Sequence, residues 1–198
     1  MNEKSKLEIV SIFTAAYLII FTIFAAVNKN YEFLYYIIIM GILIGIGILY
    51  HKKIHLTLHI IIGLSILGFM HISGGIFYFN GARLYDIYLI GKVLRYDNLV
   101  HSFGIFVSTF VVYNLLKPHL DKKLIHNKYL ISLILILMAM GAGALNEVLE
   151  LGAVVFLGAA EQVGDYFNNA LDLIFNLIGS VIACFFIIYY HKKISRKK

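Results

Sequence analysis

The sequence has very little proline, cysteine or charge, and each shortage excludes a class of protein. Its 198 residues include one proline and one cysteine, and only 14% of them are charged. A single cysteine excludes an intrachain disulfide and a cysteine-based metal site. One proline argues against a collagen-like or disordered chain. A soluble domain keeps about a quarter of its residues charged, so the composition also argues against a soluble protein.

Apolar residues make up most of the chain, which is 61% hydrophobic and has a mean hydropathy of +0.85. A helix needs about twenty apolar residues to cross a bilayer, and the sequence contains six runs of that length. They are about twice as long as membrane β-strands, and lipid cannot satisfy an open backbone, so all should be helices. We expect an all-α, polytopic membrane bundle in a single domain (1–198), with transmembrane helices at about 7–27, 32–50, 54–72, 97–116, 129–150 and 171–190.

Single residues refine this expectation. Cys184 lies in the sixth run, where it fills space as a small apolar residue, and Pro118 follows the fourth run and should end that helix. Residues 151–160 are also apolar, but adding them to the fifth run gives about 45 Å of helix, so we expect them to tilt, break or re-enter. Three glycines of the second run have the small-residue spacing that lets helices approach closely: Gly41, Gly45 and Gly47.

Basic residues are concentrated on one side of the expected bundle. The two termini and the second and fourth loops hold thirteen Lys and Arg, and the other loops hold four. The positive-inside rule therefore places both termini in the cytoplasm of a cell-membrane protein. Three acidic residues lie on the inner side and eight on the outer, which gives net charges of +10 and −4. We expect membrane lipids as partners and no nucleic acid, because the basic residues lie between apolar runs.

The connection between the third and fourth runs, residues 73–96, is long and should lie on the outer side. Its apolar residues continue between the charges, and tyrosine favours the depth of the lipid head groups. We interpret this connection as a lid or a helix at the membrane interface. Its tyrosines are Tyr78, Tyr85, Tyr88 and Tyr96.

Four of the six runs carry polar side chains near their outer ends. An ionisable group there costs about 2.5–3.5 kcal/mol to insert, so it needs a partner or a function. Asp97 and His101 share a helix face because they are four residues apart. Glu147 and Glu150 follow about 27–32 Å of helical rise in the fifth run. Three further residues lie at the same level in the third and sixth runs: His71, Asp172 and Asn176.

The Glu147 and Glu150 pair is the strongest candidate for a functional site. Two carboxylates on an apolar helix repel each other, so a proton, a cation or a basic partner must balance them. Asp97 and Asp172 have an alternative interpretation as acids at helix N-termini, and the histidine and the amide could be polar contacts between helices. The cofactor is unknown, with a divalent cation as the candidate. Its candidate ligands are His101, Glu147, Glu150 and Asp172.

A second histidine set, His51, His55 and His59, has a four-residue spacing that resembles zinc-ligand spacing. No nearby acid completes it, Lys52 and Lys53 interrupt it, and three ligands on one straight helix converge poorly on one ion. We favour a polar face at the membrane interface for this set.

Two stretches resemble the YjdF-like bacterial inner-membrane proteins. Residues 71–103 contain HISGG, then YF, then RYDNLVH, and residues 146–180 contain NEVLELGAVVFLG and VGDYFNNALDLIFNLIGS. Within the second stretch, Asp172, Asn176 and Gly179 also resemble the D-x-x-x-N-x-x-G tail of the VanZ-like proteins. In place of the tryptophan and aspartate that YjdF-like proteins tend to have after Gly-Asp, this chain has Tyr-Phe-Asn. Glu150 stands where VanZ-like proteins tend to have glutamine.

The resemblance covers about residues 65–185 and implies a multi-pass membrane protein with a polar pocket. It implies no particular reaction, because the YjdF-like family has none assigned and VanZ-like proteins are linked only to glycopeptide-antibiotic tolerance. The residues that the resemblance indicates for the pocket are His71, Asp97, His101, Glu147, Glu150, Asp165, Asp172 and Asn176.

Three functions remain open. The pocket could bind or transport a cation, a lipid head group or a lipid-linked substrate. It could belong to an enzyme that uses a metal to activate water or polarise a phosphoryl oxygen of a lipid head group, although no Gly-x-Ser-x-Gly motif or phosphate loop is present. It could be the polar layer of a structural bundle. The chain is small for a transporter and shows no clear inverted repeat, so a transporter of this size would be expected to form a homo-oligomer.

Overall fold

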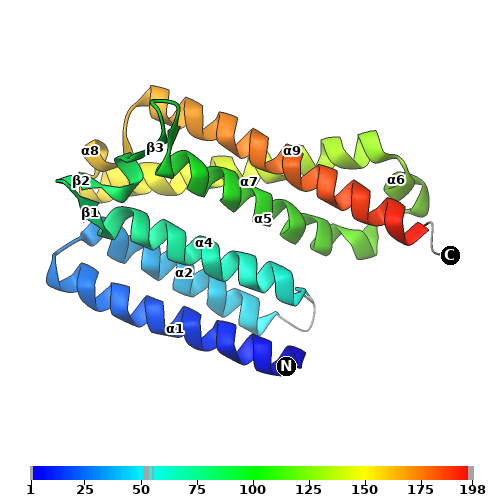
Figure 1. Cartoon of the computed structure of the whole chain (residues 1–198), viewed down its shortest axis with the longest axis horizontal. Helices are drawn as coiled ribbons and strands as arrows, with labels where there is room; N and C mark the ends of the chain where they lie inside the picture. The colour runs from blue at the N-terminus through cyan, green and yellow to red at the C-terminus, as the bar shows by residue number, and fades with distance from the viewer. Residues whose placement is uncertain (1, 51–53, 55, 196–198) are drawn as a thin grey trace.

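The computed structural model describes residues 2–50, 54 and 56–195. Six long helices lie alongside one another (Figure 1). All six are long and apolar enough to cross a membrane, so the predicted all-α bundle is confirmed. The helices are α1 (Glu3–Val27), α2 (Tyr31–Leu49), α4 (Leu58–Ile76), α5 (Tyr96–Leu116), α7 (Lys128–Leu157) and α9 (Tyr166–Ser195). Short helical segments connect them: η1 (Leu84–Asp86), η2 (Lys117–His119), α6 (Lys122–His126) and α8 (Ala160–Val163).

Helix ends follow from local sequence. Asn2, Asn30 and Asn127 precede α1, α2 and α7, and each side chain accepts a backbone N–H from the first turn of its helix. This contact satisfies a donor that has no partner within the helix. At the other end of a helix, α5 stops at Leu116, and Pro118 lies in the short η2 segment that follows, as the sequence predicts.

The bundle consists of two groups of three helices. α1, α2 and α4 pack around one apolar core, which includes Tyr17, Phe21 and Phe33. α5, α7 and α9 form the second group (Figure 1), and α7 and α9 share a core that includes Leu135 and the free, buried Cys184. The two groups meet where α4 contacts α5 and α2 contacts α7.

The two ends of the bundle differ. α1 begins and α9 ends at one end, while the connection between α4 and α5 folds into two hairpins at the other (Figure 1). In the first hairpin β1 (Tyr78–Phe79) pairs with β2 (Ala82–Arg83), and in the second β3 (Tyr88–Ile90) pairs with β4 (Leu94–Arg95). We call this the hairpin end.

The sequence suggested a lid or an interfacial helix for residues 73–96, and most of this connection forms hairpins instead of a helix. Asn80 and Gly81 both adopt left-handed backbone angles, with φ of 52° and 83°. Two such residues form the tight turn that favours a β-hairpin over a helix. Tyr78 and Tyr88 are exposed on the hairpins, whereas the side chain of Tyr85 lies inside the bundle.

Two further expectations are wrong in part. α7 does not break at residue 150 but continues to Leu157, where Gly158 in the left-handed region (φ 71°) ends it. The chain then turns back through α8. The second run's glycines do not pack closely inside the described chain: a Cβ built at Gly41, Gly45 or Gly47 would meet no described atom within 4 Å.

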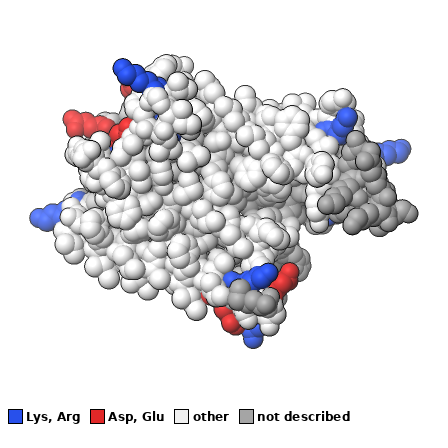
Figure 2. Space-filling view, in the orientation of Figure 1, with Lys and Arg blue, Asp and Glu red and all other residues white. Residues whose placement is uncertain are grey.

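On the face that Figure 2 shows, Lys, Arg, Asp and Glu gather at the two ends of the molecule, and an uncharged band lies between them. Large apolar side chains are exposed along the long helices, such as Ile12, Phe185 and Leu137. In water such a surface would be strongly unfavourable, so the band is the part of the protein that contacts lipid.

Candidate functional site

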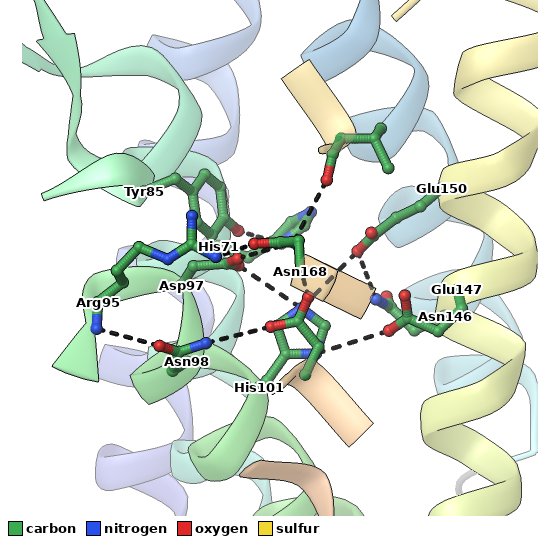
Figure 3. A network of polar contacts seen from close by, with 12 residues as sticks. His71, Tyr85, Arg95, Asp97, Asn98, His101, Asn146, Glu147, Glu150 and Asn168 are labelled. Carbon is green, nitrogen blue, oxygen red and sulfur yellow. Dashed lines mark hydrogen bonds and ion pairs between the residues drawn. The ribbon is translucent and has the colours of Figure 1, made fainter. Parts of the chain in front are cut away.

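His101 lies at the centre of a polar cluster at the hairpin end (Figure 3). Its side chain is only 9% exposed. α5 supplies His101 and Asp97, α7 supplies Glu147 and Glu150, and α9 supplies Asp172. Three helices that are far apart in the sequence therefore bring these five predicted residues together. We call them the His101 cluster.

The two ring nitrogens of His101 face different carboxylates. Nε2 lies 3.5 Å from Oδ1 of Asp97, 3.9 Å from Oε1 of Glu150 and 3.9 Å from Oδ2 of Asp172. Nδ1 lies 3.8 Å from Oε1 of Glu147. An N–H···O hydrogen bond spans about 2.7–3.2 Å, so all four contacts are longer than hydrogen bonds. Carboxylates surround the ring without bonding to it directly.

Buried amides hold the carboxylates of Asp97 and Asp172. Asn98 donates to Oδ1 of Asp172 at 3.3 Å. Asn168 donates to Oδ2 of Asp172 at 2.8 Å and to Oδ2 of Asp97 at 3.5 Å. Arg95 fixes both amides, because its guanidinium donates to Oδ1 of Asn168 and its backbone N–H donates to Oδ1 of Asn98. These contacts orient the carboxylates toward His101.

Sequence reasoning missed two of these residues, Asn98 and Asn168. Neither is charged, so neither stands out in an apolar run as a buried acid does. The available signal is spacing, because Asn168 precedes Asp172 by four residues and shares its helix face.

Glu147 and Glu150 differ in their surroundings. Asn146 donates to Oε1 of Glu150 at 2.7 Å. Both carboxylate oxygens of Glu147 are shielded from solvent and have no hydrogen-bond partner among the described residues. An unsatisfied buried carboxylate is costly, so Glu147 is the member of the cluster that most requires a further partner.

The cluster holds four carboxyl groups and one imidazole. If all four carboxylates were ionised they would contribute −4, and a protonated His101 would reduce this only to −3. Arg95 contacts Asn168 rather than a carboxylate. Buried like charges are strongly unfavourable unless a proton or a cation is shared among them.

His71 lies outside this cluster, within an aromatic wall next to it. Nδ1 of His71 lies 2.6 Å from the hydroxyl of Tyr85, and its ring contacts Phe33 and Tyr36. Burial raises the pKa of the Tyr85 hydroxyl well above its usual range, so this hydroxyl keeps its proton. We assign it as the hydrogen-bond donor to Nδ1 of His71. His71 is thus a satisfied buried histidine that faces the site.

A small cavity of about 70 Å³ lies beside the cluster, lined by its members Asp97 and Glu150 but not by His101, Glu147 or Asp172. This volume holds an ion with a few waters. Arg83 contacts Glu32 at 3.7 Å and Asp86 at 3.1 Å on its wall. Its other polar lining residues include His71, Arg95, Asp97, Glu150 and Asn168.

Besides His71, two more predicted site residues lie apart from the cluster. Asp165 is exposed, and its carboxylate accepts the backbone N–H of Asn168 at 3.0 Å, so it caps the start of α9. Asn176 lies one turn deeper than Asp172 and is fully buried against Gly143 of α7. Its amide oxygen and nitrogen have no hydrogen-bond partner in the described chain.

Of the second histidine set only His59 is described, and it is exposed near the start of α4, apart from the His101 cluster. His51 and His55 lie outside the described residues.

Histidine and carboxylate oxygens are metal ligands, and two groups in the cluster have ligand atoms within 4.8 Å of one another. One is Asp97, His101 and Asp172, and the other is His101, Glu147 and Glu150. Imidazole suits zinc, iron, copper and nickel, and carboxylates suit manganese and magnesium. The arrangement is therefore chemically suited to a divalent cation.

The family comparison agrees with the fold. A family model described as "Predicted membrane protein (DUF2238)" matches residues 9–193 and so includes the whole His101 cluster. No curated protein and no solved structure matches the chain. The YjdF-like proteins, which the sequence resembles, are the family that this model describes. The chain belongs to the DUF2238 family of predicted membrane proteins.

Proposed function

We propose that this is a cation-binding membrane protein and that the His101 cluster is its binding site. The observation that carries the proposal is the buried excess of carboxylates around one imidazole, with both oxygens of Glu147 lacking a hydrogen-bond partner among the described residues. Ionisable groups inside apolar helix bundles are costly, and they commonly mark ion pathways. A bound cation would neutralise this charge and supply the missing partner.

The cavity favours a cation over a larger ligand. About 70 Å³ accommodates an ion and a few waters, whereas a lipid head group would require the hairpins to move. We propose that the cation enters at the hairpin end, through the space between the hairpins and Asp97.

A buried polar stripe on α9 supports transport as well as binding. Asp172, Asn176 and Ser180 follow one another at four-residue intervals, and none is exposed. This spacing places them on one helix face. The stripe continues from the cluster toward the middle of the bundle. There the amide of Asn176, which has no hydrogen-bond partner in the part of the chain that the structure describes, offers an oxygen to a passing cation. A homo-oligomer would supply the size that a single chain lacks.

A second candidate is a metal-assisted enzyme acting on a lipid head group. Arg83 and Arg95 line the same cavity as the carboxylates. Arginine binds phosphate oxygens well, and a metal next to it would polarise a phosphoryl group. Incubation with a membrane lipid extract, followed by mass spectrometry, tests this candidate: a new lipid product that Asp172→Asn does not form supports it, and no product contradicts it.

We further propose an orientation of the protein in the membrane and a relation to the VanZ-like proteins. The excess of Lys and Arg near the termini and in the second and fourth loops supports cytoplasmic termini, which would place the hairpin end outside. The spacing of Asp172, Asn176 and Gly179 supports a relation to the VanZ-like tail. We expect no nucleic-acid partner, since the charge of the chain is explained by topology.

Cation-dependent stabilisation tests the binding function. We would measure the midpoint of thermal unfolding of the detergent-purified protein with Na⁺, K⁺, Mg²⁺, Ca²⁺, Mn²⁺, Co²⁺ or Zn²⁺ present. A ligand of the native state raises this midpoint. We expect at least one cation to raise it in the wild type and in the exposed control Asp165→Asn, but not in Asp172→Asn. A folded wild type that responds to none of them would leave the structural bundle as the function.

A further inference from the structure

The His101 ring separates the four carboxylates into two sets. Three of them, from Asp97, Glu150 and Asp172, face Nε2, and Glu147 alone faces Nδ1. If the four carboxylates balanced their charge only by sharing protons, they would not need to be divided in this way. It is the division expected when one ring nitrogen binds a metal and the other donates its proton to an outer carboxylate.

The distances from Nε2 to the three carboxylates are close to those of a coordination sphere. Asp97, His101 and Asp172 already have ligand atoms within 4.8 Å of one another, and Glu150 must move toward the two aspartates to complete the set. Metal–nitrogen and metal–oxygen bonds of about 2.0–2.2 Å place the ligand atoms of a tetrahedral site about 3.4 Å apart. The oxygens of Asp97, Glu150 and Asp172 lie 3.5, 3.9 and 3.9 Å from Nε2. These separations are too long for hydrogen bonds and exceed the tetrahedral value by only a few tenths of an ångström.

We propose that a divalent transition-metal cation binds between Nε2 of His101 and the carboxylates of Asp97, Glu150 and Asp172. Glu147 then accepts a hydrogen bond from the Nδ1–H of His101, as an outer carboxylate that does not touch the metal. This inference rests on the proposed cation-binding function and names its ligand class. It also changes the sequence-based ligand set, by adding Asp97 and moving Glu147 out of direct contact with the metal.

The surrounding amides support this assignment. Asn98 and Asn168 donate to Asp172, and Asn146 donates to Glu150. Outer hydrogen bonds of this kind orient metal-binding carboxylates. No amide of the described residues donates to Glu147, as expected if its partner is the imidazole N–H, which a closer approach of the ring would supply.

The ligand types select the metal class. Ca²⁺ takes six to eight oxygen ligands and Mg²⁺ keeps several waters, and neither prefers imidazole. One imidazole with three carboxylates suits Zn²⁺, Mn²⁺, Fe²⁺ or Co²⁺.

Cobalt titration provides the test. The full-length protein in detergent, stripped of metal by a chelator, would be titrated with Co²⁺, whose visible absorption reports coordination geometry. We expect one Co²⁺ per chain, with the intense bands of a four-coordinate site, and displacement by Zn²⁺. His101→Ala and Asp172→Asn should each weaken binding more than 100-fold.

Glu147→Gln separates the outer role from a ligand role. Loss of an outer partner costs about 10- to 100-fold in metal affinity. We expect a loss in that range, with one Co²⁺ still bound and the absorption bands unchanged. The control Asp165→Asn removes an exposed acid at the same end of the bundle and should bind Co²⁺ as the wild type does.

The outcomes distinguish the two proposals. If Glu147→Gln lost binding as completely as Asp172→Asn, Glu147 would be a direct ligand and the assignment would be wrong. Equal Co²⁺ binding by Asp172→Asn and wild type would place the ion elsewhere. If Na⁺ or K⁺ stabilised the wild type but not Asp172→Asn while Co²⁺ failed to bind, the cation-binding function would stand and the transition-metal inference would fall.

Discussion

At the scale of single residues, Tyr85 and His71 satisfy each other inside the aromatic wall of the site. The Tyr85 hydroxyl lies 2.6 Å from Nδ1 of His71. Tyr85→Phe would leave that buried nitrogen without its donor, which costs about 1–3 kcal/mol. We expect a lower midpoint of thermal unfolding in detergent. Tyr88→Phe, at an exposed hairpin position, is the matched control and should leave the midpoint unchanged.

The same contact has a defined pH dependence. Burial raises the pKa of Tyr85 well above the value of about 10 found in an unfolded chain. A group with a raised folded-state pKa contributes its stability in full below the unfolded pKa, and loses it as pH rises toward the folded pKa. The difference in unfolding midpoint between wild type and Tyr85→Phe should therefore be constant from pH 6 to 9. A difference that shrinks within this range would contradict a protonated Tyr85 donor.

Some site residues could be found from the sequence, and the reason is energetic. His101, Glu147 and Glu150 interrupt apolar runs, where an ionisable side chain is expensive. Asn98, an uncharged amide, gives no comparable signal, although it is one of the most buried polar residues. Asp165 carries the same charge as Asp172 but caps α9 instead, because the chain turns at Gly164 just before it. Only the fold separates these two aspartates.

At the scale of helices, Gly179 sets how closely α9 approaches α5. A Cβ at this position would lie 2.1 Å from the carbonyl oxygen of Ser102. Gly179→Ala must therefore push the helices apart, and overpacking of this kind costs about 1–3 kcal/mol. We expect a lower unfolding midpoint and weaker cation binding, since Asp172 and His101 lie on the same two helices. Gly141→Ala in α7 meets no described atom within 4 Å and should be neutral or slightly stabilising.

Helices and hairpins differ in how well they could be predicted. Each long helix has enough apolar residues to cross a bilayer, so length and composition alone predicted all six. The connection between α4 and α5 has a similar apolar content, and its turns depend on the left-handed angles of a few residues such as Asn80 and Gly81. The end of α7 likewise depends on Gly158, because an apolar run does not indicate where a helix stops.

At the scale of the molecule, the sequence predicts how many helices there are but not which ones are neighbours. The hydroxyl of Tyr35 in α2 donates to the carbonyl oxygen of Leu149 in α7 at 3.3 Å, although 114 residues separate them. His71 of α4 lines the cavity next to the His101 cluster, which α5, α7 and α9 form. The site therefore depends on contact between the two groups of helices, which hydropathy does not encode.

The orientation of the whole molecule is a separate prediction from charge. Thirteen Lys and Arg near the termini and in the second and fourth loops, against four in the other loops, favour a cytoplasmic N-terminus. In a Cys184→Ser background, single cysteines would be placed at two exposed sites, Lys92→Cys in the second hairpin and Lys4→Cys in the first turn of α1. We expect a membrane-impermeant maleimide to label Lys92→Cys in intact cells and Lys4→Cys only after permeabilisation. The reverse pattern would mean that the cavity faces the cytoplasm and that the cation enters from inside the cell.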